Sequence, residues 1–309
     1  MWKHWLHSVW LVLGEYLKMV DQLTIVMPAY NEEKSLKAFL PEFIDYINLK
    51  GFKAIIVNDG SKDNTAEVLK EFDKEPLLQV VNKKVNTGYG GAIKSGIQNV
   101  DTKYVITMDA DAQHHFSDVE KLFSEVKKID ADMIVGRRNN MGIAGFYRRL
   151  GRFLIRTIAR TLMPIKIHDI NSGMKVYRTE LAKKYIKLCP DSMAFSDIIT
   201  MVFVSQKHLV EERLIDIKAR EAGVSTISTQ TAIETLIEII NIVVLFNPLK
   251  IFLPLSIFLF FGGVAWGMKF ILAKQGLSLG ALLGIIAGLL FFFLGLIAEQ
   301  LSLIRKNSL

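Results

Sequence analysis

The chain has 309 residues, of which 50% are hydrophobic, and it carries a formal net charge of +7. Its single cysteine, Cys189, excludes an intrachain disulfide and a cysteine-based zinc site. The basic excess is concentrated between Ile134 and Lys187, where 13 Lys or Arg residues stand against 2 acidic ones. Such a patch needs an anionic partner or neighbour, which could be nucleic acid, phospholipid or a phosphorylated substrate.

The first 20 residues have the pattern of an amphipathic helix. Trp2, Trp5 and Trp10 recur with other apolar residues at helical spacing, opposite charged residues such as Lys3 and Lys18. Tryptophan favours the headgroup level of a bilayer, so the segment is typical of an interfacial helix. An ordinary helix packed on a domain fits the same pattern. A signal peptide is not indicated, because charge interrupts the apolar stretch and no small-residue cleavage site follows.

From Leu23 onward, short apolar runs alternate with helical patterns. Strands are predicted at Leu23–Met27, Lys53–Val57, Leu77–Val81, Tyr104–Met108 and Asp132–Gly136, with helices between them. Nearly continuous apolar strands that are joined by helices indicate a parallel sheet covered on both faces, an α/β fold. In such sheets, ligands bind outside the carboxyl ends of the strands.

The residues that follow the first four strands are polar, acidic or glycine-rich. They read PAYNEE (28–33), NDGSKDNT (58–65), NKKVNTGYGGA (82–92) and DADAQHH (109–115). Because parallel strands end at one edge of the sheet, we expect these segments to form one crevice. The glycine-rich segment is neither a P-loop nor a dinucleotide fingerprint, because Ile93 occupies the position that both motifs need for glycine or alanine.

A divalent cation is predicted after the fourth strand. Asp109, Asp111 and Gln113 carry side-chain oxygens on alternate residues, which in an extended segment point to one side. Mg²⁺ and Mn²⁺ take such oxygens, and Mg²⁺ usually completes its shell with substrate phosphates. The alternative is a solvated acidic turn.

A basic stripe is predicted further along the chain. Arg148, Arg152, Arg156 and Arg160 recur every four residues, so on a helix they share one face. An anionic membrane surface or a lipid phosphate would stabilise them. A solvated helix face is the alternative.

The carboxyl-terminal part is predicted to cross a membrane twice. Residues 251–268 and 276–298 are free of charge and long enough to span a bilayer, although two buried core helices would share this composition. The expected organisation is an amphipathic helix (1–20), a catalytic domain (21–228), an interfacial helix (229–248), two transmembrane helices (249–303) and a cytoplasmic tail (304–309).

The motifs PAYNEE, NDGSKDNT, DADAQH and DINSGMKVYR, in this order, resemble those of family 2 glycosyltransferases, and within them the polyprenyl-phosphate glycosyltransferases. The likeness covers residues 23–228, and the two spans match the bacterial and archaeal branch. It implies a GT-A fold, which is Rossmann-like with a mostly parallel sheet, followed by two transmembrane helices. It further implies a metal-dependent enzyme that uses Mg²⁺ or Mn²⁺. The implied reaction moves a hexose, with inversion, from GDP-mannose, UDP-glucose or UDP-N-acetylhexosamine to dolichol or undecaprenyl phosphate.

The resemblance also implies roles for individual residues. The donor pocket would include Pro28, Ala29, Tyr30, Glu32, Val57, Asp59, Asn86, Gly88, Asp109 and Ala110. The metal would be held by Asp111 and Gln113, and the acceptor phosphate by Arg148, Arg152 and Arg220. The catalytic residues would be Asp109, Asp111, Asp169 and Arg220.

Two positions depart from the family pattern or carry an open role. Asn58 stands where the family usually has the first of two aspartates, so Asp59 is the better candidate donor contact. Asp197 lies where inverting GT-A enzymes often carry an acidic base. A phosphate acceptor reduces the need for such a base, because its second pKa near 6 leaves it mostly dianionic at neutral pH.

Two rival functions remain open. A membrane-bound polysaccharide or glycolipid synthase of family 2 shares the same machinery, but its Q-x-x-R-W motif is missing. A non-catalytic nucleotide- or lipid-binding membrane protein would leave DADAQH unexplained.

The resemblance implies a nucleotide sugar, a polyprenyl phosphate and membrane lipids as partners, and no nucleic acid; a homo-oligomer stays open. The expected location is the cell membrane. Because nucleotide sugars are made in the cytosol, the catalytic domain and both termini are expected to be cytoplasmic.

Overall fold

A computed structural model describes residues 22–111, 113–139, 167–216, 237, 240, 243–244, 247–276 and 278–307. The described residues fall into two compact units, one before position 217 and one made of the carboxyl-terminal helices. The predicted amphipathic helix (1–20), the arginine stripe (148–160) and most of the interfacial helix predicted at 229–248 lie outside the described residues. The expected domain boundaries stay predictions.

The first unit is built on a seven-stranded, mostly parallel sheet with the strand order β3-β2-β1-β4-β6-β5-β7. Its strands are β1 (Leu23–Ala29), β2 (Lys53–Asn58), β3 (Leu78–Asn82), β4 (Tyr104–Thr107), β5 (Met133–Arg138), β6 (Lys175–Arg178) and β7 (Val210–Ile215). Neighbours pair in parallel, except that β6 runs antiparallel to both β4 and β5. The five predicted strands are confirmed to within two residues at each end.

The strands β6 and β7 were not predicted. β6 has only four residues, and charged side chains stand at both of its ends. β7 contains the run Glu211–Arg213, which hides its apolar pattern. Charged residues are common on edge strands such as β7, because they discourage pairing with another chain.

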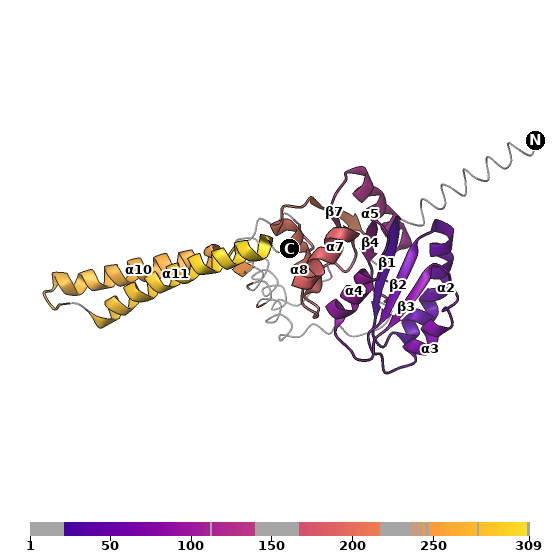
Figure 1. Ribbon diagram of the computed structural model, residues 1–309, viewed down its shortest axis with the longest axis horizontal. Coiled ribbons are helices and arrows are strands. Elements are labelled where there is room, and N and C mark those ends of the chain that lie inside the picture. Colours follow the sequence, from indigo (N-terminus) through magenta and orange to yellow (C-terminus); the bar gives the residue numbers. More distant parts are fainter. Residues whose placement is uncertain are drawn as a thin grey trace, which may run out of the picture. The chain divides into compact units, whose positions relative to one another are not determined.

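Helices cover both faces of this sheet. They are α2 (Glu33–Lys50), α3 (Thr65–Lys70), α4 (Tyr89–Gln98), α5 (Phe116–Lys128), α7 (Thr179–Tyr185) and α8 (Phe195–Ser205), with a 3-10 turn η1 (Ile186–Leu188). In Figure 1, α2 and α3 lie on one face of the strands β1–β3 and α4 lies on the other. The helices α2, α3, α4 and α5 begin shortly after β1, β2, β3 and β4 end. Their amino-terminal ends therefore lie at the carboxyl ends of the strands, on both faces of the sheet.

Alternation along β1 divides its side chains between the two helical layers. Ile25 and Met27 belong to the core cluster that includes α2 and α5, whereas Val26 points toward α4. A Cβ on Gly96 of α4 would also lie 3.2 Å from Val57 Cγ2. Glycine at this position therefore lets α4 pack closely on β1 and β2, which brings the first turn of α4 to the edge where these strands end.

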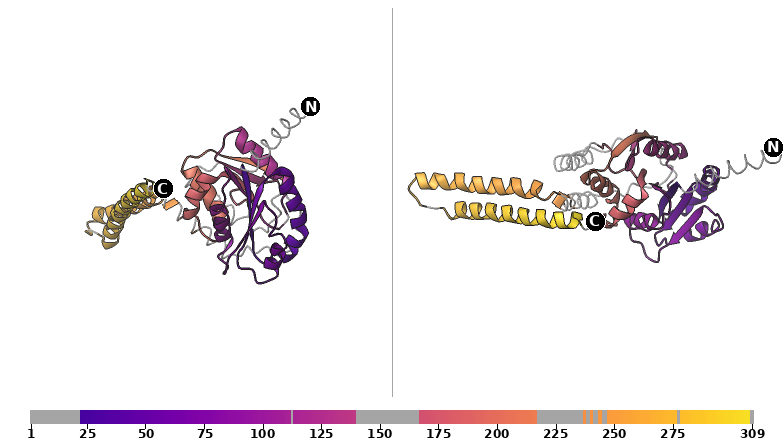
Figure 2. Two further views of the ribbon diagram at one scale, coloured as in Figure 1. Left: turned by 45° about the vertical axis from the view of Figure 1, so that its right-hand side comes forward. Right: turned by 45° about the horizontal axis from the view of Figure 1, so that its top comes forward.

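The second unit is a hairpin of two long apolar helices, α10 (Leu249–Leu272) and α11 (Leu279–Asn307), which lie side by side in the views of Figures 1 and 2. Both are long and apolar enough to cross a membrane, and they are candidate membrane spans. A Cβ on Gly288 would lie 2.7 Å from Phe260 N, so glycine permits the contact. Ser256 Oγ donates to Gly288 O at 2.8 Å. Large apolar side chains such as Phe258 face outward, as a lipid-exposed surface requires.

Candidate functional site

Four loops meet at one edge of the sheet because β1 to β4 are parallel neighbours. Ala29 pairs with Asn58, and Asn58 with Asn82, so β1, β2 and β3 end at one level. β4 joins the other side of β1. The structure thus brings together the loops that the sequence singled out after each strand.

The loops after β1 and β2 are tied together by short polar contacts. Asn31 has a positive φ of 54°, and its Oδ1 accepts from Lys62 N at 2.8 Å. Asn31 N donates to Ser61 Oγ at 3.0 Å. The carboxylate of Glu32 accepts from Ser35 Oγ, whereas Tyr30 leaves 40% of its surface exposed. Of the two predicted donor contacts in this loop, the Tyr30 ring is therefore the more accessible.

Several predicted donor-pocket residues are part of the protein core. Ala29, Val57 and Ala110 are buried, and Val57 has no exposed surface. Neither the side chain nor the backbone of Val57 is open to a donor, because the whole residue is buried between β1 and β3. Pro28, within β1, is partly buried.

Asp59 organises the loop after β3. This carboxylate is buried and accepts from Thr87 N at 3.0 Å and from Gly88 N at 2.9 Å. Lys83 Nζ lies 3.3 Å from it. Asn86 Oδ1 accepts from Gly88 N at 2.9 Å as well. Both predicted donor residues of this loop, Asn86 and Gly88, are therefore positioned through Asp59.

We expect Asp59→Asn to destabilise this loop. The amide would place an N–H group against backbone N–H donors that now point at a carboxylate. Leaving such buried groups unsatisfied costs about 1–3 kcal/mol. Thermal unfolding and calorimetric binding of UDP and GDP measure the effect, and the exposed Asp73→Asn is the matched control. Unchanged stability and nucleotide binding would contradict the assignment.

The glycine-rich start of α4 packs against the loop before α8. Gly88 has φ 88°, and a Cβ there would lie 2.6 Å from Asp191 O. A Cβ on Gly90 would lie 2.9 Å from Phe195 Cβ. The resemblance implies a donor-pocket role for Gly88. Packing within the protein requires these glycines whether or not a donor is bound.

Asp109 lies where β4 ends and is held by side chains from other elements. Tyr89 Oη donates to Asp109 Oδ1 at 3.0 Å, and His114 Nε2 lies 3.8 Å from Oδ2. Burial raises the pKa of Asp109, but the contacts with His114 and Tyr89 and the charge of Arg138 outweigh it and hold the pKa below its usual value. His114 Nδ1 is buried without a hydrogen-bond partner among the described residues.

The predicted metal ligands Asp111 and Gln113 are partly exposed and adjacent. Gln113 N donates to Asp111 Oδ1 at 3.2 Å. Within the part of the chain that the structure describes, no three His, Cys, Asp or Glu side chains come together as a metal-binding group. The donor set therefore fits a hard cation that takes only part of its shell from the protein and the rest from substrate oxygens.

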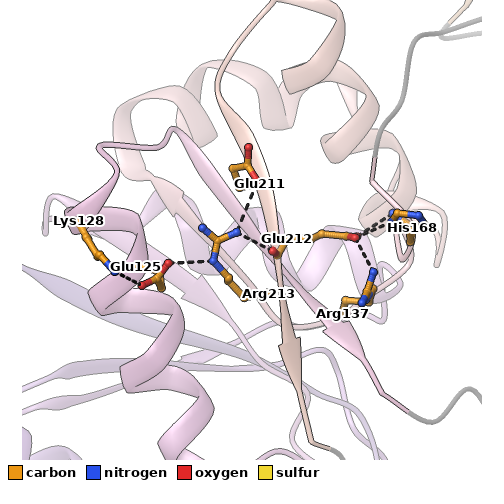
Figure 3. A network of polar contacts seen from close by, with 7 residues as sticks. All are labelled: Glu125, Lys128, Arg137, His168, Glu211, Glu212 and Arg213. Carbon is orange, nitrogen blue, oxygen red and sulfur yellow. Dashed lines mark hydrogen bonds and ion pairs between the residues drawn. The ribbon is translucent and has the colours of Figure 1, made fainter.

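Two consecutive arginines at the end of β5 point to opposite sides, as alternate residues of a strand do. Arg138 binds Asp169 through two nitrogens, at 2.8 and 2.9 Å. Burial raises the pKa of Asp169, but Arg138 lowers it below its usual value. Arg137 instead binds Glu212 of β7 at 2.9 Å, and Glu212 also holds His168 at 2.6 Å (Figure 3). Arg137 and His168 therefore meet at one carboxylate of β7.

Sequence reasoning missed Tyr89, Arg138, Gly173 and Lys175 at this edge. Arg138 could have been found, because it follows a predicted strand. Tyr89 and Gly173 stand in motifs that were examined for other reasons. Lys175 stands in the same motif as Gly173, DINSGMKVYR, but nothing in the motif indicates that this lysine is buried. The predicted acceptor residues Arg148, Arg152 and Arg220 lie outside the described residues, and their roles stay predictions.

The sheet, its helices and the acidic end of β4 define the class: a glycosyltransferase with the GT-A fold. The chain belongs to glycosyl transferase family 2, whose family model matches residues 24–186. A second model, the GtrB C-terminal hairpin, matches residues 247–304.

Relatives match both parts of the chain. An undecaprenyl-phosphate 4-deoxy-4-formamido-L-arabinose transferase of Shewanella sediminis is 26% identical over 304 residues, which are 93% of this chain and 89% of that one. A dolichyl-phosphate beta-glucosyltransferase of Dictyostelium discoideum is 29% identical over 205 residues, 60% of this chain and 62% of its own length. Mycobacterium tuberculosis glucosyl-3-phosphoglycerate synthase, solved with Mn²⁺, UDP-glucose and phosphoglyceric acid, shares the fold. Its TM-score is 0.58 at 14% identity, over 72% of this chain and 80% of that one.

Proposed function

We propose that this glycosyltransferase moves a hexose from a nucleoside diphosphate sugar to a polyprenyl phosphate at the cytoplasmic face of the membrane. One observation carries the proposal: a GT-A domain and a hairpin of two candidate spans occur in one chain. The domain suits a soluble activated sugar, and the hairpin suits a substrate that is dissolved in lipid. Relatives named for dolichyl and undecaprenyl phosphate support the same acceptor class.

The transfer is a single displacement with inversion. An oxygen of the acceptor phosphate attacks the anomeric carbon of the sugar and forms the new carbon–oxygen bond. The bond from that carbon to the nucleoside diphosphate breaks, and the diphosphate leaves with the electron pair. The acceptor phosphate is already largely dianionic at neutral pH, so the nucleophile needs no base. Catalysis then rests on positioning and charge stabilisation.

Residues at the end of β4 would serve the donor. Asp111 and Gln113 would hold Mg²⁺ or Mn²⁺, which supplies positive charge to the departing diphosphate when bound. Asp109 would face the nucleotide sugar, with its carboxylate oriented by Tyr89. Arg220 would add a second positive charge on the phosphates.

The acceptor phosphate would be bound by Arg148 and Arg152. We expect Arg148→Ala to raise the KM for lipid phosphate by about 10- to 100-fold, because a hydrogen bond to a charged group is worth about 1.5–3 kcal/mol. The KM for the nucleotide sugar should stay within about twofold. Initial rates at varied acceptor and donor concentrations separate the two. Arg149→Ala, one position off the predicted stripe, is the control; an unchanged acceptor KM would remove Arg148 from the site.

The membrane placement follows from the donor. Nucleotide sugars are cytosolic, so the GT-A domain and both termini would face the cytosol, with the two spans returning the chain to that side. Protease access to a carboxyl-terminal tag in sealed inside-out and right-side-out vesicles measures this. Cleavage only in right-side-out vesicles would contradict the orientation.

A donor panel tests the function itself. The full chain in lipid nanodiscs is given Mg²⁺ or Mn²⁺, a polyprenyl phosphate, and GDP-mannose, UDP-glucose or UDP-N-acetylhexosamine in turn. Mass spectrometry of the organic phase should show a polyprenyl phosphate heavier by one sugar. Nucleotide binding without transfer from any donor would favour a non-catalytic binder instead.

A further inference from the structure

Lys175 is a lysine with no exposed surface at the edge of the sheet that carries the site. It is the first residue of β6 and pairs with Thr107 of β4 and Val135 of β5. Because β6 runs antiparallel to its neighbours, its amino end lies where β4 and β5 have their carboxyl ends. The same reversal places this buried lysine beside Thr107, two residues before Asp109.

The ammonium of Lys175 joins two segments that each carry an aspartate. Its Nζ donates to Ile170 O at 2.8 Å and also to Ser196 O. Ile170 directly follows Asp169, and Ser196 directly precedes Asp197. One side chain therefore fastens the loop before β6 to the first turn of α8.

The surrounding charges explain why a lysine is tolerated here. Burial, with the charge of Arg138, lowers the pKa of Lys175 to about 8, although the charges of Asp197 and Asp169 oppose this shift. The pKa of Asp197 is raised to about 6, mainly by burial. The charges of Lys175 and Arg138 lower this pKa, whereas the charge of Asp169 raises it. Asp197 also stands in the first turn of α8, where the helix dipole favours a carboxylate.

Both fastened segments touch the surroundings of Asp109. Gly173, in the loop before β6, lies so close to Asp109 that an added Cβ would be 2.8 Å from its Cγ. Thr107 Oγ1 donates to Gly173 O at 2.8 Å. On the other side, Tyr89, which holds Asp109, has Ser196 near its hydroxyl group. Displacing either segment would therefore disturb the Asp109 carboxylate.

We propose that Lys175 is a positioning residue of the sugar transfer, which fastens the segment of Asp169 to the segment of Asp197 beside Asp109. The charge of Lys175 also favours the ionised form of the Asp197 carboxylate. The role in transfer rests on the proposed function, because it requires the enzyme to turn over at this site. The link between Lys175 and Asp197 does not require turnover. Lys175 is a positioning residue rather than a catalytic one because it has no exposed surface, and its Nζ donates to two backbone carbonyls of the described residues.

The pH dependence has a defined sign. Asp197 is ionised above its pKa, so a transfer that needs its negative charge loses activity as the pH falls below about 6. Without the charge of Lys175, the pKa of Asp197 rises and the loss begins at higher pH. The groups that act on Asp197 from neighbouring elements are Lys175 on β6, Asp169 before it and Arg138 on β5. Of these three, Lys175 has the largest effect on the pKa of Asp197.

The test compares Lys175→Met, Lys175→Arg, Asp197→Asn and the double variant Lys175→Met/Asp197→Asn, each as the full chain in nanodiscs. Infrared spectroscopy across pH follows the carbonyl band of protonated buried carboxyl groups. In Lys175→Met, we expect a band at neutral pH that the double variant lacks, and a midpoint at higher pH than that of the unchanged protein. In a plot of kcat against pH, the pH at which kcat falls on the acid side should rise by the same amount. Lys175→Arg, which keeps the charge, should move both by less.

The outcomes distinguish the proposed role of Lys175 from the proposed sugar transfer. No Asp197-dependent band in Lys175→Met, or a kcat that still falls at the same acid pH, overturns the proposal. If the unchanged protein transfers no sugar, the proposed function fails while the infrared titration still reports on the Lys175–Asp197 link. If Lys175→Met does not fold, the double variant should recover a cooperative thermal transition, because it removes both buried charges. A double variant as unstable as the single one would contradict the pairing.

Discussion

Replacing Asp111 by alanine is expected to abolish metal-dependent sugar transfer. Asp111 is one of two adjacent groups, with Gln113, that can offer side-chain oxygens to a cation at the end of β4. Substituting residues that merely support metal ligands typically costs 10- to 100-fold in affinity or activity, so loss of a ligand should cost at least ~100-fold. Transfer rates measured against Mn²⁺ and Mg²⁺ concentration check this.

A second readout separates metal binding from folding. Electron paramagnetic resonance of Mn²⁺ in the presence of UDP or GDP should show the bound ion in the unchanged protein and not in Asp111→Ala. Asp45→Ala, an exposed carboxylate on α2, is the control and should behave as the unchanged protein. Metal-dependent turnover that survives in Asp111→Ala would reject the metal assignment.

Replacing Gly173 by alanine should inactivate the enzyme through Asp109. The new Cβ would lie 2.8 Å from Asp109 Cγ and 2.9 Å from Oδ1, which is closer than van der Waals contact allows. The carboxylate would have to move, and its hydrogen bond from Tyr89 would break. A displacement of ~1 Å at a reacting centre can cost about 100-fold in rate. Overpacking typically costs about 1–3 kcal/mol of stability.

The two effects of Gly173→Ala are measured apart. Steady-state kinetics give the loss in kcat, and denaturant unfolding gives the loss in stability. Gly262→Ala in α10, where nothing lies within 4 Å of an added Cβ, is the matched control. A Gly173→Ala enzyme with unchanged kcat would show that the position of the Asp109 carboxylate is not critical.

The two substitutions test different requirements of the site at the end of β4: the bound metal and the position of the Asp109 carboxylate. Asp111→Ala should remove the response to metal while leaving the packing of the loops intact. Gly173→Ala should leave Asp111 and Gln113 in place while it displaces Asp109. A variant that loses activity but still binds Mn²⁺ and nucleotide would therefore assign the loss to the neighbouring carboxylate.

Local sequence patterns were sufficient for the parallel half of the sheet. The strands β1 to β4 are short apolar runs that are closed by polar segments, and both signals act over fewer than about ten residues. Their carboxyl ends meet at one edge because parallel neighbours connected by helices must end together. The amino-acid sequence alone was therefore enough to place the carboxylates Asp109 and Asp111 beside the loops after β1 and β2.

Some predicted residues lie in the expected loops but make contacts that the sequence did not indicate. Asp59 was predicted as a donor contact, and its carboxylate is occupied by the backbone of Thr87 and Gly88. Gly88 was predicted in the donor pocket, and it faces Asp191 O. Such contacts join segments that are far apart in the sequence, and a motif contains no information about the partner it will meet.

The sequence by itself determined the family, the parallel strands, the acidic strand end and the two apolar helices, because each is encoded in neighbouring residues through periodicity, composition or motif. Only the tertiary structure decided that the antiparallel strand β6 inserts between β4 and β5. With β6 in this place, Gly173 lies against Asp109 and Arg138 binds Asp169. Lys175 is buried at the same edge of the sheet. The physical reason is that the pairing of β6 depends on contacts between residues far apart in the sequence. The packing of the whole core determines it, and the four residues of β6 do not.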